Sequence, residues 1–577
     1  MPFLRVLIAI GVGLALADAS VVTLALPPML VDLDTTVEGV AAVIGVYTVV
    51  LAAALPLAAW ARRRVPDAAL GAAGFALFAV AGALCATPDS LAPLLAFRAL
   101  QAIGAAAGLV AGFALLRGDR LWVLAAVFGT AVGPALGGAL TQAFDWRAIF
   151  LIQLPLGALA AGAALLERST RLDAAGVGGA AATGAARRGG AAATGPAAGV
   201  GGAAATGAAR SGGAAGAVVA LAALSAALTG VLFLLVLLLV SGWSLEPLAA
   251  AAAVSVLPVA AFAGARVRGD AAVRAAAGSA LVGAGVLALA VLPGSSVAWI
   301  VVPQLLAGTG MGMALPALAG ELLPERTPGQ AAALLSIRHV GITVALVALA
   351  PVAAAQLDST VADVRERGAA LVLDARLPPL DKLELAGPLV ADLDPVNPRD
   401  GLRAALDAQA PRFADDPEQR AEYAELTQRA DDALMAGIDG SFRIAFVIAG
   451  GLALLGAVAV LPRASSGGRV VVVATALGAL LLPAVHAIVR PQIAPDPVVI
   501  ADPCEPRAMP KTGGFDGFVQ DQALSALDRA ACRFGSSREE LALALADEDE
   551  ARAYEAAYGV DPRSAGGLLD LLGISLG

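Results

Sequence analysis

Residues 5–27 read RVLIAIGVGLALADASVVTLALP, an apolar run with a single acidic residue, Asp18. A helix that crosses roughly 30 Å of hydrocarbon needs about 20 such residues, because lipid cannot hydrogen-bond an exposed backbone. The run is longer than the apolar part of a signal peptide, carries Asp18 in its middle and is followed by further apolar runs. We therefore expect it to be retained as a membrane-spanning helix.

Twelve more apolar runs of similar length follow it. Hydrophobic residues make up 59% of the chain and the mean hydropathy is +0.80, which is more than soluble globular domains usually show. The predicted fold class is an all-α integral membrane protein, with spans at 5–27, 39–61, 68–86, 91–115, 121–143, 147–166, 217–241, 247–265, 275–293, 297–319, 330–355, 441–462 and 469–489.

Arginine occurs in every second connection between these spans. Connections rich in Lys and Arg face the cytoplasm in membrane proteins. The short connections on the other side contain no Lys or Arg: 28–38, 87–90, 143–146, 242–247 and 293–296. We therefore expect a multi-pass protein of the cytoplasmic membrane, with the N-terminus inside and, after an odd number of spans, the C-terminus outside. The residues that set this orientation are Arg5, Arg62, Arg63, Arg64, Arg117, Arg120, Arg168, Arg266, Arg268, Arg274, Arg326, Arg463 and Arg469.

The segment 172–216 consists mainly of Ala, Gly and Thr, and it divides the spans into six and seven. It repeats the string AAGVGGAAATGAAR at 174–187 and 197–210, and small residues of this kind bury too little apolar surface to fold. We expect a flexible cytoplasmic linker between two helical bundles. The predicted domains are a six-helix bundle (1–171), the linker (172–216), a second six-helix bundle (217–355 with 441–463), an external loop domain (356–440), an extra span (464–490) and an external tail (491–577).

The external loop and tail are acidic and have helical periodicity. The loop carries 18 acidic and 9 basic residues, and the tail carries 15 and 7. Ser537 and Glu540 form a capping-box pattern that opens a helix in the tail. Cys504 and Cys532 lie in this tail, where an oxidising compartment would allow a disulfide, and two free thiols are the alternative. The third cysteine, Cys85, is expected to be a buried small side chain.

Charged residues inside spans face a bundle interior far more often than they face lipid. Asp18 lies in the first span, and Arg98 begins the string RALQAIGAAAG in the fourth, where it shares a helical face with Gln101. The fifth span contains GTAVGPALGG, in which glycine recurs every four residues. Small residues at that spacing let two helices approach closely, and proline bends the axis. The residues of this motif are Gly129, Gly133, Pro134, Gly137 and Gly138.

These three strings resemble the first-, fourth- and fifth-helix signatures of the drug:proton antiporter branch of the major facilitator superfamily. The string DASVVTLALP from Asp18 resembles the first, with Ser20 and Thr23 in place of Thr and Asn; the fourth matches at Arg98 and Gln101, with Ala102 in place of Gly; the fifth is complete. Further matches include Arg147 and Arg338. The resemblance covers about 1–355 and 441–462, and it implies a major facilitator fold of two six-helix bundles, with one extra C-terminal span.

The resemblance also implies a function, namely proton-coupled efflux of a hydrophobic or amphipathic compound such as a drug or lipid. Asp18 would be the protonation or substrate site, and a structural hydrogen-bonding aspartate is the alternative. Arg98 would either be its buried partner or take part directly in proton coupling, while Gln101 shares its helical face. The glycines of the fifth span are packing residues first, and only the resemblance gives them a gating role.

The sequence departs from the family in the loop after the second span. There the chain reads AWARRRVPDAA, without an aspartate at the family's ion-pair position, and Asp67 lies four positions late. A second hypothesis is therefore a degenerate transporter that serves as a membrane scaffold, whose external loop and tail bind a cell-envelope partner. Lipid, protons and a small hydrophobic substrate are the other expected partners. No enzyme activity, cofactor, metal or nucleic acid is predicted, and His339 is expected to be solvated near the cytoplasmic end of its span.

Overall fold

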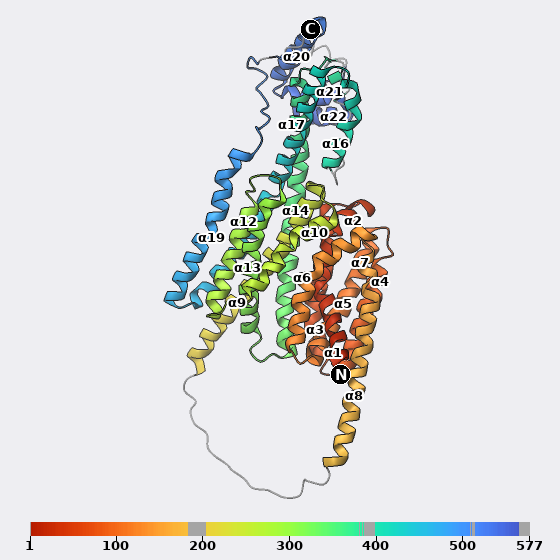
Figure 1. Ribbon diagram of the computed structural model, residues 1–577, viewed down its shortest axis with the longest axis vertical. Helices are drawn as coiled ribbons and strands as arrows, with labels where there is room; N and C mark the ends of the chain where they lie inside the picture. The colour runs from red at the N-terminus through yellow and green to blue at the C-terminus, as the bar shows by residue number, and fades with distance from the viewer. Residues whose placement is uncertain are drawn as a thin grey trace.

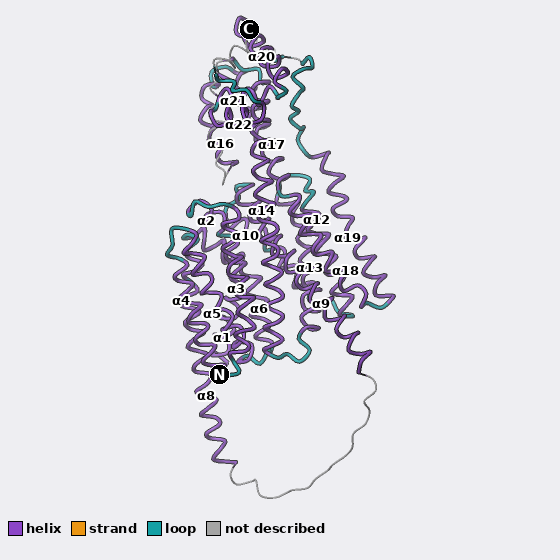
Figure 2. Tube along the Cα trace, turned by 180° about the vertical axis from the view of Figure 1, so that it is seen from behind, coloured by secondary structure: helices purple, strands orange, loops and turns teal. Residues whose placement is uncertain are grey.

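The computed structural model describes residues 2–182, 203–379, 381–382, 385, 398–507, 509–510 and 514–564, and these form helices joined by loops (Figure 2). Twelve helices of the described part have the length and apolar composition to cross a membrane. A further helix, α6 (Arg120–Ala143), lies in the same bundle, so that each of the thirteen predicted spans corresponds to a helical segment. The predicted all-α membrane class is confirmed.

The first six spans form one half of the bundle. α1 packs against α6 and α8, α4 packs against α5 and α8, and α3 packs against α5. Two short helices, α2 and α7, lie at the end of the bundle opposite the N-terminus (Figure 1). The helices of this half are α1 (Pro2–Thr23), α2 (Leu26–Asp32), α3 (Val37–Ala61), α4 (Asp67–Cys85), α5 (Leu91–Leu115), α6, α7 (Ala148–Leu151) and α8 (Gln153–Ala182).

The second half repeats this arrangement with six more spans. A π-helix, η1 (Leu237–Gly242), continues α9, and two short helices share one span. Its helices are α9 (Ala203–Val236), α10 (Pro247–Val254), α11 (Val256–Gly264), α12 (Ala271–Leu289), α13 (Val297–Leu322), α14 (Pro328–Asp374) and α18 (Arg443–Val460). The halves meet where α14 packs on α3 and α10 packs on α6. At the first contact the Thr48 and Thr343 hydroxyls lie 3.1 Å apart, and the Ser336 hydroxyl donates to the Ala52 carbonyl at 2.9 Å.

The extra span, α19 (Ser466–Ile493), follows the short 3₁₀ turn η3 (Leu461–Arg463) and lies at the edge of the bundle (Figure 1). It packs against α12, where His486 is buried with its Nδ1 3.2 Å from the Ala288 carbonyl. Most of its large apolar side chains point outward, among them Leu477 and Leu481. Such a face suits contact with hydrocarbon rather than with water.

A helical cap stands on the bundle at the end opposite the N-terminus (Figure 1). It consists of the end of α14 beyond residue 356, α16 (Pro398–Gln409), the 3₁₀ turn η2 (Ala410–Phe413), α17 (Pro417–Ser441), α20 (Gly514–Phe534), α21 (Arg538–Ala546) and α22 (Glu548–Tyr558). The N-terminus and the cap thus lie at opposite ends, as an odd number of spans requires. Which end faces the cytoplasm stays a prediction from the arginine pattern.

Helix continues across both limits expected for the external loop, 356 and 440. α14 does not end at the membrane limit but continues to Asp374, 47 residues in all, and α17 leads into α18 with only Phe442 between them. The reason is that the two extensions pack against each other, for example through the Ser441 and Thr360 hydroxyls at 2.7 Å. A fall in hydropathy along the sequence predicts where a helix leaves the bilayer. It does not predict where the helix ends.

Helix extends into both ends of the expected linker, 172–216. α8 runs to Ala182 and α9 begins at Ala203, so that helix covers both ends of the segment. Alanine has the highest helix propensity, which explains the extension of both helices from the bundle. Part of each copy of the internal duplication, and the expected flexibility between 183 and 202, lie outside the described residues.

The tail is fixed to the rest of the cap by several contacts. Cys504 and Cys532 form a disulfide, with their Cα atoms 5.0 Å apart, while Cys85 is a buried free thiol. The buried guanidinium of Arg538 binds the Asp374 carboxylate at 2.7 Å, and Arg365 binds Glu550 at 3.0 Å. The end of α14 is therefore the element on which the tail is mounted.

The predicted topology can be tested through the tail cysteines. In intact cells, a membrane-impermeant maleimide should label Cys504 and Cys532 only after reduction, because both are expected outside and are paired. Cys85 should stay unlabelled in either case, since it is buried in the bundle. Labelling that requires permeabilised cells would place the tail in the cytoplasm and reverse the orientation.

Candidate functional site

A buried ion pair between α1 and α5 forms the centre of the candidate site. The side chains of Asp18 and Arg98 are both fully buried, and Arg98 Nη2 donates to Asp18 Oδ2 at 2.6 Å. Two charges in a nonpolar interior are costly unless they are paired and hydrogen-bonded. The sequence-predicted residues Asp18 and Arg98, 80 positions apart, therefore meet in the fold.

Two glutamines complete the contacts of the carboxylate. Gln101, one turn after Arg98 on α5, accepts from Arg98 Nη1 at 2.6 Å and places its Nε2 3.4 Å from Asp18 Oδ1. Gln153, at the start of α8, donates to Asp18 Oδ1 at 3.2 Å, and its own oxygen accepts from Gln101 at 2.7 Å. Asp18 thus receives hydrogen bonds from three side chains on two neighbouring helices.

The guanidinium of Arg98 is also held from its other sides. Its Nε donates to the Val43 carbonyl of α3 at 3.1 Å, and the ring of Tyr47 lies 4.4 Å from its carbon Cζ. The Tyr47 hydroxyl donates in turn to the Ala15 carbonyl of α1 at 2.9 Å. These contacts leave Arg98 little freedom to move without disturbing α3. The fork of the guanidinium suits this role, since it presents donors in several fixed directions.

The charge of this cluster depends on whether the Asp18 carboxyl group carries a proton. As an anion, Asp18 is neutralised by Arg98; as a neutral acid, it no longer needs that positive charge, and the pair can separate at lower cost. Because the carboxyl group is sealed from solvent in this conformation, a proton can reach it only after the helices around it move.

Stability measurements can test the coupling within this pair. Arg98→Met should destabilise the protein by roughly 3 kcal/mol, because it leaves the Asp18 carboxylate buried without a counter-charge. The double variant Asp18→Asn/Arg98→Met should recover a large part of that loss, since no unpaired charge is left. Thermal unfolding of the two single variants and the double variant in lipid nanodiscs forms the cycle. Additive effects would show that the pair does not act as one unit.

The glycine motif of α6 packs directly against α1. A Cβ atom added at Gly129 would lie 2.3 Å from the Gly13 carbonyl oxygen, and one at Gly137 would lie 2.3 Å from that of Val21. Between them, a Cβ at Gly133 would lie within 2 Å of the Ser20 hydroxyl. Real Cβ atoms do not approach backbone so closely, so glycine is required at Gly129 and Gly137, whereas a side chain at Gly133 would first displace the Ser20 hydroxyl. The same helix that carries Asp18 is therefore in backbone contact with α6.

Gly138 faces a different neighbour. A Cβ there would lie 2.7 Å from the Pro247 carbonyl oxygen and 2.6 Å from Ala251 Cβ, both on α10 of the second half. Pro134 is buried in the same helix. α6 is thus placed between α1 of its own half and α10 of the other, and a shift of one half relative to the other must act on it.

The other family-matched residues do not join the buried pair. Arg147 lies at the end of the bundle near α2 and α7, where it binds the Asp89 carboxylate at 3.0 Å and those of Asp32 and Asp145 at 3.2 Å. Arg338 lies half-buried on α14, and the described part of the chain gives it no hydrogen bond or ion pair.

Two sequence-based expectations need comment. The expectation that His339 is solvated is wrong: its ring is buried, with Nδ1 2.7 Å from the Leu335 carbonyl, because it lies in the packed part of α14. The displaced Asp67 does form an ion pair, in which Arg62 binds it through two bonds of 2.9 Å. This pair connects the end of α3 with the start of α4.

Sequence reasoning missed Gln153 and Tyr47. A signal for Gln153 was present, since it is the only polar side chain between Arg147 and Glu167. An isolated polar residue within a membrane span generally faces a polar partner, and this criterion would have found it. Tyr47 had no comparable signal, because an aromatic residue in a span usually serves only to fill space.

The sequence profile of the Major Facilitator Superfamily matches residues 8–346. Among curated relatives, the chain is 27% identical over 165 residues to the riboflavin transporter RibZ of Clostridioides difficile (strain 630), a match that covers 27% of this chain and 36% of RibZ. It is 32% identical over 165 residues to the putative multidrug resistance protein MdtD of Pectobacterium carotovorum subsp. carotovorum (strain PC1), covering 27% and 35%. The chain thus spans about a third of the length of these relatives.

One more curated relative and one solved structure are also similar to this chain. The multidrug resistance protein Stp of Mycobacterium tuberculosis (strain CDC 1551 / Oshkosh) is 33% identical over 174 residues, covering 27% of this chain and 32% of Stp. Among solved structures, a bacterial homologue of the human lysosomal transporter Spinster, in an inward-facing and unoccupied conformation, aligns with a TM-score of 0.49 at 15% identity. That alignment covers 81% of this chain and 98% of the homologue.

Proposed function

Since the chain belongs to the Major Facilitator Superfamily of secondary transporters, we propose that it exports hydrophobic or amphipathic compounds across the cytoplasmic membrane in exchange for protons. One observation carries the proposal: the fully buried carboxylate of Asp18 is paired with Arg98 and hydrogen-bonded by two glutamines. A charged cluster at this depth costs free energy and points to a function in ion or substrate movement.

In this proposal Asp18 takes up the proton, and Arg98 stabilises the anionic form until it does. Gln101 and Gln153 keep the carboxyl group oriented in both protonation states, because an amide can donate to the anion and can also accept from the neutral acid. Loss of the negative charge weakens the hold of α1 on α5. The transition that follows exposes Asp18 to one side of the membrane, where the proton leaves.

The glycine face of α6 supports a route from this site to the second half. α6 contacts α1 through Gly129 and Gly137 and contacts α10 through Gly138, at distances that leave no room for side chains. A change in the angle between the halves would therefore move α6 against α1. The names of the relatives, which include two multidrug resistance proteins, support a hydrophobic or amphipathic substrate.

Transport in proteoliposomes tests the proposal. With ethidium as a lipophilic cation and a fluorescent amphipathic acid as a second probe, an imposed pH gradient should drive probe accumulation, and adding probe should drive proton movement in the opposite direction. The uncoupler that collapses the gradient should abolish accumulation. If neither probe moves and no probe-linked proton flux appears for a wider set of amphipathic compounds, the scaffold hypothesis is favoured.

A further inference from the structure

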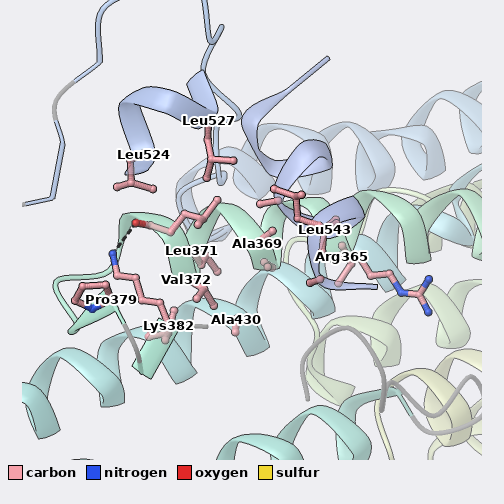
Figure 3. Close-up of a pocket in the computed structure, with 18 of the residues that line it drawn as sticks. Arg365, Ala369, Leu371, Val372, Pro379, Lys382, Ala430, Leu524, Leu527 and Leu543 are labelled. Carbon is pink, nitrogen blue, oxygen red and sulfur yellow. Dashed lines mark hydrogen bonds between the residues drawn. The ribbon is translucent and has the colours of Figure 1, made fainter. Parts of the chain in front are cut away.

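The cap contains an apolar cavity that the transport proposal does not use. Its volume is about 390 Å³, and it lies where the end of α14 and α17 face α20 and α21 (Figure 3). Leucines line both sides, including Leu371 and Leu426 from the loop and Leu524, Leu527 and Leu543 from the tail. Small-molecule sites usually measure roughly 300–1,000 Å³ and are predominantly apolar, so both size and lining suit a ligand.

Polar contacts outside the cavity join its two walls, the tail and α14. Arg538 and Asp374, Arg365 and Glu550, and the Ser537 hydroxyl, which donates to Glu366 at 2.6 Å, join the tail to α14. The disulfide fixes α20 to the segment that follows α19. Because these contacts fix the positions of α14 and the tail, they oppose collapse of the cavity. An apolar cavity of only about 150 Å³ in another protein stays dry and binds benzene.

One end of the cavity is polar. The Lys382 side chain is largely buried there, and its Nζ donates to the Leu373 carbonyl at 2.7 Å (Figure 3). With the amide of Gln520 oriented to satisfy both of its polar atoms, the Gln520 oxygen accepts from the same Nζ at 3.2 Å. An ammonium group has three donors, so these two contacts leave one for a ligand. Burial lowers the pKa of Lys382 to about 8, which still leaves most of it protonated at neutral pH.

We infer that this cavity is a binding site for the hydrocarbon chain of an amphipathic acid, whose carboxylate or phosphate head lies at Lys382. The apolar walls disfavour a polar ligand, and Lys382, the buried cation among the described residues that line the cavity, favours an acidic head over a neutral or cationic one. Arg365 does not compete for this role, because its guanidinium points away from the cavity and binds Glu550 (Figure 3). The site goes beyond the proposed transport function and does not depend on it.

Such an acid could arrive from the surrounding lipid or solution, or it could be delivered by transport through the bundle. The two sources predict different behaviour in Asp18→Asn, which should be unable to pump, when a photoreactive fatty acid is used to label the cavity. Labelling of the cavity that persists in this variant would indicate direct entry. Labelling that is confined to the active protein would indicate delivery by transport. Both results support the site, and the first does so even if the transport proposal fails.

The test uses a diazirine-bearing palmitic acid with the full chain in proteoliposomes under an imposed pH gradient, followed by mass spectrometry of the cross-linked peptides. We expect cross-links in 364–373 and 520–546. Leu527→Trp, which fills the cavity, should remove them, whereas Phe518→Trp, on the exposed side of the same helix, should not. Resistance of the cap to limited proteolysis, equal to that of the unmodified protein, shows that the cap has folded in both variants. Cross-links confined to the bundle, or unchanged by Leu527→Trp, would overturn the inference.

The position of the head group has its own test. Lys382→Met should weaken competition by unlabelled palmitic acid at least about tenfold, because it removes a charge-assisted hydrogen bond. Competition by the corresponding long-chain alcohol should change little. If acid and alcohol are affected equally, or neither is affected, the acidic head does not lie at Lys382.

Discussion

Asp18→Asn is expected to reduce pH-gradient-driven transport to the level of empty liposomes while the protein inserts and folds normally. Asparagine preserves the volume of the side chain and keeps one of the two oxygens that accept from Arg98 and Gln153, but it cannot exchange a proton. Because it resembles the protonated acid, we also expect downhill exchange of substrate to survive. Gradient-driven accumulation and substrate counterflow, measured on the same preparation, separate the two activities.

The matched control is Asp363→Asn, which removes an exposed carboxylate of the cap and should transport like the unmodified protein. Size-exclusion profile and thermal stability in detergent report folding of both variants. Full gradient-driven transport by Asp18→Asn would refute its assignment as the proton site and leave a structural role for the buried pair.

Gly133→Leu should block transport with an effect almost as large. Even a Cβ atom at this position would lie within 2 Å of the Ser20 hydroxyl, and a leucine side chain must push α6 away from α1. The separation would disturb the helix that carries Asp18 and the contact of Gly138 with α10. Val132→Leu is the control, since Val132 is the preceding residue of the same helix and lies on its exposed face.

Initial rates of probe transport, together with the amount of inserted protein, distinguish a blocked transporter from an unfolded one. Normal transport by Gly133→Leu would mean that close contact between α1 and α6 is not needed, and the proposed route from the buried pair to the second half would be wrong. Gly133→Ala should give an intermediate result, because the Ser20 side chain can rotate away from one methyl group more easily than from a branched chain.

Much of the fold was predictable because bilayer thickness imposes a length on each span. The buried pair was predictable for a related reason, since Asp18 and Arg98 are charges that hydrocarbon cannot accommodate singly. Their meeting point was not, because no sequence spacing fixes which helices become neighbours. Gln153 shows the same limit: its polarity was visible, but its contact with Asp18 depends on how α8 packs against α1.

The cap was the least predictable part. Hydropathy located the membrane edge near residue 356 but contained no information about the extension of α14 to Asp374. The cavity beside Lys382 arises only when α20 and α21 fold back onto α14, so no single segment encodes it. The pairing of Cys504 with Cys532 stayed open for the same reason, since the tail needed a defined fold before either thiol had a partner.

Infrared spectroscopy of the protein in lipid can detect protonation of Asp18 itself and needs no known substrate. Difference spectra between acidic and alkaline pH, compared for the unmodified protein and Asp18→Asn, isolate the carboxyl group of this residue from all others. We expect a protonated-carboxyl band, typical of a nonpolar environment, that appears at acidic pH and is missing in the variant. Identical difference spectra would show that Asp18 does not exchange a proton, and the proposed coupling would be wrong.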